Sequence, residues 1–201
     1  MLQLKYDLYY YHKNLGCIGM YDEEMVALLQ TAFKNCIVSL RQKHRENFYY
    51  FAFIFDEGMR PYISAWSYEA YNQAIIDNEI DDDDREWRKW DYADSPYAVY
   101  GYDEFFSDVS KFLNDRASKM TDDELYDVEW NTIFSSMEEA LIRLDKLNFF
   151  GTGKERKEII INVEQAPPDE NSGEYERAIR LNPPSPLLDE YLEFCESEED
   201  D

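Results

Sequence analysis

Residues 47–55 read NFYYFAFIF, a run of aromatic and β-branched side chains that is typical of a β-strand. Because its apolar character is unbroken, we expect a central strand that is covered on both faces. Residues 56–58 (DEG) indicate a turn, and residues 59–66 (MRPYISAW) predict a second strand. The two strands together predict an antiparallel hairpin. Pro61 lacks a backbone N–H, so the second strand either lies at a sheet edge there or begins after it.

The segments around this hairpin have apolar residues at helical spacing. Helices are predicted over residues 22–44, 68–80, 103–117, 121–147 and 174–181, with one or two further turns over 187–194. Ser67 is expected to cap the helix that follows the hairpin. Thr121 and Glu124 form a capping box, in which the hydroxyl and the carboxylate satisfy free backbone N–H groups reciprocally.

Residues 158–163 (EIIINV) predict a third strand. Many helices and few strands favour an α+β fold, with a mainly antiparallel sheet of few strands packed against several amphipathic helices. We expect a single domain over residues 1–195, in which residues 1–20 form an arm or an extra strand. Residues 196–201 are expected to be an acidic, disordered tail.

The charge balance of the chain restricts its partners. It carries 44 acidic and 20 basic side chains, a formal net charge of −24, together with 17 Tyr, 12 Phe and 4 Trp. This negative field repels nucleic acid and anionic lipid and attracts cationic partners. The aromatic content predicts a folded protein rather than a disordered one. We therefore expect a basic protein partner and no binding to nucleic acid or membrane.

Cysteine content and the N-terminal sequence favour a cytoplasmic protein. The three cysteines share no short spacing, which argues against a disulfide framework or a thiolate metal site. The N-terminus has no apolar stretch typical of a signal peptide, and no apolar run approaches the length of a membrane span.

No motif in the sequence carries a recognisable catalytic, cofactor or metal site. Residues 151–154 (GTGK) lack the other residues of a phosphate-binding loop, so they indicate a helix end and a turn. The acidic run at 81–84 lacks the spacing of a calcium loop and predicts a solvated loop or a contact for basic residues of a partner. His12 and His44 lie beside basic residues without a nucleophile. We expect no enzyme activity, no cofactor and no metal.

The segment around Trp87 and Trp90 is the candidate binding site. Large aromatic side chains in a loop either plug a core edge or act as interface anchors. We expect one of the two tryptophans to be buried and the other to be at least half exposed beside the acidic run. The candidate partner-binding residues are Asp81, Asp82, Asp83, Asp84, Trp87, Trp90, Asp91 and Tyr92.

The order of several passages carries a family resemblance. FYYFAFIF is followed by SAWSYEAY, WRKWDYADSPY, YDEFFSDVSKFL, LDKLNFFGTGKERKEIIINV and RLNPP. In this order the chain resembles the bacterial family known as domain of unknown function 4303, over roughly residues 23–194. The strongest passages are 150–156 and 181–183. The Tyr-rich segment before Tyr21 and the acidic end after Phe194 depart from the family.

The resemblance implies a cytosolic bacterial protein, similar in size and acidity to immunity proteins that neutralise polymorphic or contact-dependent toxins; it implies no catalytic residues. Charge and resemblance together predict an immunity or inhibitor protein that occludes a basic toxin, such as a nuclease. The acidic loops would mimic nucleic-acid charge and the aromatics would supply affinity. Alternatives are a non-catalytic regulatory or scaffold protein and an enzyme with an unrecognised site. The sequence does not determine the oligomeric state.

Overall fold

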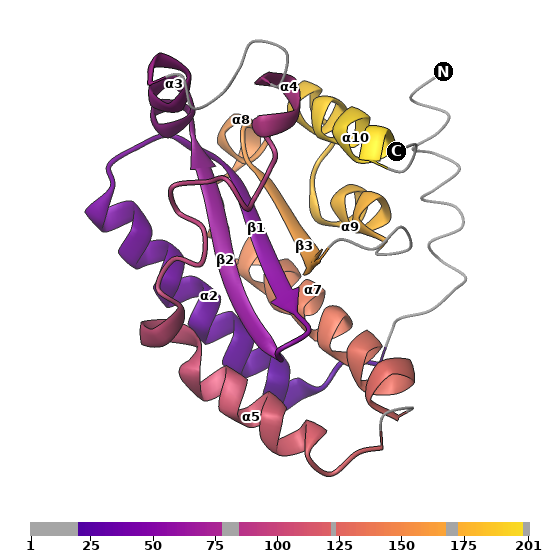
Figure 1. Ribbon diagram of the computed structural model, residues 1–201. Helices are drawn as coiled ribbons and strands as arrows, with labels where there is room; N and C mark the ends of the chain where they lie inside the picture. Colours follow the sequence, from indigo (N-terminus) through magenta and orange to yellow (C-terminus); the bar gives the residue numbers. More distant parts are fainter. Residues whose placement is uncertain (1–19, 78–84, 122–123, 168–172, 199–201) are drawn as a thin grey trace.

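The structure, a computed structural model, describes residues 20–77, 85–121, 124–167 and 173–198. Helices precede a two-stranded hairpin, separate it from a third strand and follow that strand, and the chain crosses from one face of the sheet to the other (Figure 1). In chain order the elements are α2 (Glu23–Lys43), β1 (Phe48–Asp56), β2 (Arg60–Ser67), α3 (Tyr68–Ile76), α4 (Arg85–Arg88), η2 (Tyr102–Phe106), α5 (Ser107–Ala117), η3 (Leu125–Glu129), α7 (Trp130–Lys146), α8 (Gly153–Arg156), β3 (Ile160–Ala166), α9 (Glu174–Leu181) and α10 (Pro186–Glu198).

The α+β class is confirmed, and the sheet has the order β2-β1-β3. β1 and β2 form the predicted antiparallel hairpin, with β1 in the centre and Pro61 on an edge strand. The expectation of a mainly antiparallel sheet needs correction, because β3 pairs with β1 in parallel and the sheet is therefore mixed. Because β2 is antiparallel to β1, it ends where β1 starts, and the helices between β2 and β3 bring the chain to the other edge of β1 at that same end of the sheet.

The uniform burial of β1 follows from helices on both of its faces. Phe51, Phe53 and Phe55 pack toward α2, α5 and α7, whereas Tyr50 and Ile54 pack toward α9 and α10. Figure 1 shows these two helical layers on opposite sides of the sheet. Alternate residues of a strand point to opposite faces, so a strand between two apolar layers must be apolar throughout.

The predicted helix caps are present. The Ser67 hydroxyl accepts a hydrogen bond from the backbone N–H of Ala70. Thr121 and Glu124 exchange the bonds of a capping box: each side chain accepts from the other residue's N–H. The sequence did not predict the π-helical turns η2 and η3, which precede α5 and α7.

Both outer edges of the sheet are covered. On β3, the side-chain amide of Asn182 bonds to both the N–H and the C=O of Ile161, at 2.9 and 2.7 Å. Arg177 donates to the Val163 carbonyl at 2.7 Å. On β2, the Tyr100 N–H donates to the Ile63 carbonyl at 3.2 Å. Side chains and a loop therefore occupy positions where a further strand would pair.

The C-terminal helix extends beyond the domain limit that the sequence predicted. Helix α10 continues to Glu198, so the first residues of the tail expected over 196–201 are helical. The expected arm or extra strand over 1–20 lies almost entirely outside the described residues, as do residues 199–201.

Candidate interaction surface

Residues 85–92, the segment that contains the candidate tryptophans, are fixed to the sheet by three hydrogen bonds. The Trp66 indole N–H donates to the Asp91 carbonyl at 2.7 Å, and the Ser64 hydroxyl donates to the Tyr92 carbonyl at 2.7 Å. The Tyr49 hydroxyl donates to the carbonyl of Lys89 at 2.8 Å. The first residues of this segment form the short helix α4, where the sequence had suggested a loop.

Trp90 is a core residue. Its side chain is 1% exposed and its ring lies 5.5 Å from Tyr50 and 5.1 Å from Tyr191, centroid to centroid, in edge-on arrangements. Aromatic rings in this arrangement add favourable contacts to the burial of their surface. Trp90 therefore attaches the segment to the face of the sheet that α9 and α10 cover.

Trp87 differs from Trp90 because it is 43% exposed. The expected division between a buried and an exposed tryptophan is present, although Trp87 is slightly less than half exposed. The Trp87 ring lies 6.5 Å from the ring of Phe194 on α10. The Arg88 guanidinium lies 5.3 Å from the centre of the Trp87 ring, within the range of a cation–π contact. Among the aromatic side chains of residues 85–92, Trp87 is exposed, Tyr92 is half-buried and Trp90 is buried.

Asp91 and Tyr92 have contacts that hold the segment together. The Asp91 carboxylate accepts the backbone N–H of Ala93 at 2.8 Å and lies 3.6 Å from Arg88. The half-buried Tyr92 directs its hydroxyl to the Gln165 carbonyl at 3.5 Å. Asp81–Asp84 lie outside the described residues. A partner-binding role for any of these residues stays a prediction.

Trp87 lies near acidic side chains as well as beside the cation Arg88. Glu86 precedes Trp87 and is exposed, and Glu190 and Glu193 project from α10 at the spacing that shares one helix face. Lys89 contacts Glu190 at 2.5 Å, which fixes α10 beside α4. We define the Trp87 surface as Trp87, Phe194, Glu86, Glu190 and Glu193.

Several arginines are neutralised within the fold. Arg116, for example, donates to the buried carboxylate of Glu129 through two nitrogens, at 2.7 and 3.0 Å. The pairs of this kind are Arg116 with Asp22 and Glu129, Arg143 with Glu23 and Glu139, Arg156 with Asp145, and Arg180 with Glu138. Cations used in this way are unavailable to an acidic partner, so the acidic excess dominates the surface field.

The structure places the remaining motifs of the sequence within the described part of the chain. Residues 151–154 form a turn and the start of the four-residue helix α8. The ring of His44 packs edge-on against Tyr97, 4.7 Å between centroids. Among the described residues, no group of three or more His, Cys, Asp and Glu side chains is placed to hold a metal ion. In the same residues, no helix combines the length and apolarity needed to cross a membrane.

Sequence reasoning missed a buried polar cluster under Trp90. The hydroxyls of Tyr50 and Tyr191 both donate to the buried carboxylate of Glu164, and the Asn162 amide donates to Tyr191 at 2.9 Å. Burial, followed by interactions with Glu164 and other neighbouring acidic groups, raises the pKa of Tyr50 well above its ordinary value, so its phenol stays protonated. The sequence did hold a signal for this cluster. Side chains alternate between the two faces of a strand, and this alternation places Glu164 of β3 on a face that is covered by the core.

The comparisons with known proteins concern the family. No curated protein and no solved structure matches the chain. A family model described as "Domain of unknown function (DUF4303)" matches residues 29–183. Within that range lie Arg156 and Asn182, which meet at the edge of β3: an Arg156 nitrogen donates to the Asn182 side-chain oxygen at 3.2 Å. The chain therefore belongs to the DUF4303 family, a domain of unknown function.

Proposed function

We propose that this protein is a non-catalytic inhibitor of the immunity-protein type, which binds a basic toxin and occludes its active surface. The Trp87 surface would be the contact region. The observation that carries the proposal is an exposed tryptophan in contact with Phe194 of α10, a helix with exposed glutamates, on a chain with a formal net charge of −24. Tryptophan is among the residues most enriched at interface hot spots.

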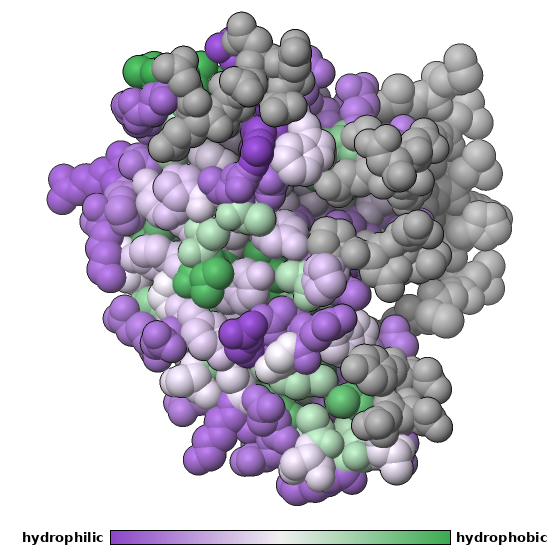
Figure 2. Space-filling view, viewed as in Figure 1, coloured by the Kyte–Doolittle hydropathy of each residue, from purple (hydrophilic) through white to green (hydrophobic). Residues whose placement is uncertain are grey.

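The surface of the molecule and the edges of its sheet support binding through side chains. For the molecule more generally, Figure 2 shows one face, on which hydrophobic side chains occur in small patches among hydrophilic ones. Such a face suits an interface in which charge steers the approach and a few anchors provide affinity. The covered edges of β2 and β3 argue against a partner that adds a strand to the sheet, because the pairing positions at Ile63 and Ile161 are already occupied.

The proposal is tested by capturing partners from the native host with the full-length protein and then measuring binding to the purified partner. We expect a basic partner whose association rate falls steeply between low and physiological salt, because steering of this kind is screened. Trp87→Ala should weaken binding by roughly 2 kcal/mol or more. Val128→Ala provides a control, since Val128 is 55% exposed and lies outside the Trp87 surface.

Activity assays of the captured partner separate inhibition from scaffolding. If the protein is an inhibitor, adding it should suppress the toxic or nuclease activity of the partner, and Trp87→Ala should relieve that suppression. A partner without such activity would favour the regulatory or scaffold alternative. An acidic partner that binds with salt-independent kinetics would refute the proposal.

A further inference from the structure

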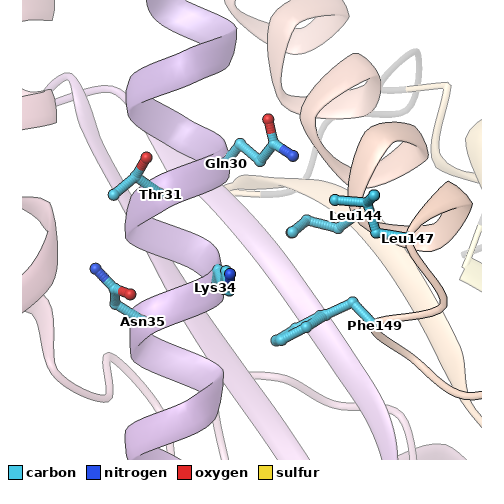
Figure 3. Close-up of a pocket in the computed structure, with 7 residues that line it drawn as sticks. All are labelled: Gln30, Thr31, Lys34, Asn35, Leu144, Leu147 and Phe149. Atoms are coloured by element: carbon cyan, nitrogen blue, oxygen red, sulfur yellow. The ribbon is translucent and has the colours of Figure 1, made fainter.

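A cleft lies between α2 and the end of α7, on the face of the sheet opposite the Trp87 surface. Its volume is about 380 Å³, which falls within the range of about 300–1,000 Å³ typical of small-molecule sites. Its lining residues are Gln30, Thr31, Lys34, Asn35, Leu144, Leu147 and Phe149 (Figure 3).

The cleft has an apolar wall and a polar wall. Leu144, Leu147 and Phe149, from the end of α7 and the turn after it, form the apolar wall, and Leu147 is 70% exposed. Gln30 and Lys34, from α2, form the polar wall. Figure 3 shows Gln30 extending toward α7 and Phe149 extending toward α2, whereas Thr31 and Asn35 lie on the other side of α2. A ligand here would contact hydrocarbon on one side and hydrogen-bonding groups on the other.

The charge of this cleft is opposite to that of the molecule as a whole. None of its lining residues is acidic, and Lys34 makes no ion pair within the part of the chain that the structure describes. Arg41 lies at the margin of the cleft: its guanidinium donates to the Phe149 carbonyl at 3.3 Å and stacks over the Phe149 ring at 5.7 Å. Lys34 is thus an exposed cation next to apolar side chains, on a chain with 44 acidic residues.

We propose that this cleft binds a small amphipathic carboxylate. The apolar body of the ligand would lie against Leu144, Leu147 and Phe149, and its carboxylate would contact the Lys34 ammonium. A lysine presents a single point charge with rotatable donors, which matches a monoanion. The side-chain amide of Gln30 can donate a second hydrogen bond. This site is separate from the Trp87 surface, so the two proposals can fail independently.

Octanoate is a suitable probe because it combines one carboxylate with a short apolar chain. We expect saturable binding in a titration followed by NMR signals of the Leu144 and Leu147 methyl groups. 1-Octanol, which lacks the charge, and Lys34→Gln should each weaken binding by about tenfold, the loss expected for a hydrogen bond to a charged group. Leu147→Gln should also weaken octanoate binding, because it replaces a side chain of the apolar wall with a polar one.

Lys111→Gln is the matched control, because Lys111 is an exposed helical lysine on α5 that does not line the cleft. It should leave octanoate binding unchanged. The proposal is overturned if millimolar octanoate leaves the Leu144 and Leu147 signals unmoved, if 1-octanol binds equally well, or if the two lysine variants behave alike. Thermal unfolding of each variant establishes that it remains folded.

Discussion

Asn182 pairs with Ile161 as a neighbouring strand would, since its side-chain amide accepts the Ile161 N–H at 2.9 Å and donates to the Ile161 carbonyl at 2.7 Å. Arg156 donates a hydrogen bond to the side-chain oxygen of Asn182 at 3.2 Å and another to the Leu181 carbonyl at 2.7 Å. The two passages that carried the family resemblance, 150–156 and 181–183, therefore meet in space. Their side chains close the edge of β3, which gives these family positions a structural role.

Replacing Asn182 by Ala should lower the free energy of unfolding by about 3 kcal/mol. The change leaves a buried N–H and a buried C=O of Ile161 without partners, and each such loss costs roughly 1–3 kcal/mol. Denaturant unfolding measures the effect. Asn35→Ala, at an exposed position of α2, should change stability by less than about 0.5 kcal/mol. A fully stable Asn182→Ala variant would show that water replaces the lost bonds.

The two tryptophans of the segment should differ in their effect on stability. Trp90→Ala removes a side chain that is 1% exposed and should cost about 3–5 kcal/mol. Trp87→Ala removes a side chain that is 43% exposed and should cost much less. Thermal or denaturant unfolding of both variants tests the difference. Equal losses would mean that Trp87 also supports the core and is a poor candidate for a partner anchor.

Alkaline pH should destabilise the protein through its half-buried and buried tyrosines. Burial raises the pKa of Tyr62 to about 12, and burial also raises that of Tyr191 well above its usual value. The native state therefore favours the neutral phenol: the stabilisation is complete below about pH 10, the unfolded pKa, and is lost as pH rises through 12. An absorbance titration should show tyrosines that ionise well above pH 10 in the folded protein, and these tyrosines should ionise near pH 10 after unfolding. Uniform titration near pH 10 with the fold intact would contradict this.

Added salt should stabilise the native state. At a formal net charge of −24, the compact chain is destabilised by repulsion among its own carboxylates, and salt screens this repulsion. Denaturation by urea, which is uncharged, should show a higher midpoint in several hundred millimolar salt than at low ionic strength. Unchanged midpoints would indicate that internal pairs such as Arg143 with Glu23 and Glu139 balance the charges locally.

Local patterns predicted the elements of the fold well. The aromatic run at 47–55 identified the central strand, and the apolar periodicity of 22–44 identified α2 within a residue at each end. The direction of β3 could not be read in the same way, because EIIINV is equally compatible with either orientation. That direction depends on how the intervening helices return the chain, which is a property of the whole fold.

The candidate site was predictable only in part. The composition around Trp87 and Trp90 indicated an aromatic contact region, but the exposure of each ring depends on the distant residues Tyr50, Tyr191 and Phe194. The cleft at Lys34 gave no sequence signal, because its lining residues come from two distant parts of the chain, 30–35 and 144–149. Spatial convergence of residues that are remote in sequence has no local signature.

The parallel pairing of β1 with β3 has a consequence for the order of folding. β1 and β2 are joined by a short turn, so their pairing is local and fast, whereas the pairing of Tyr50 with Ile160 spans more than half of the chain. During synthesis both strands of the hairpin are made long before β3 and α9 leave the ribosome. Until then, one edge of the aromatic strand FYYFAFIF lacks its native partner. This interval is when the nascent chain is most prone to aggregate or to engage a chaperone.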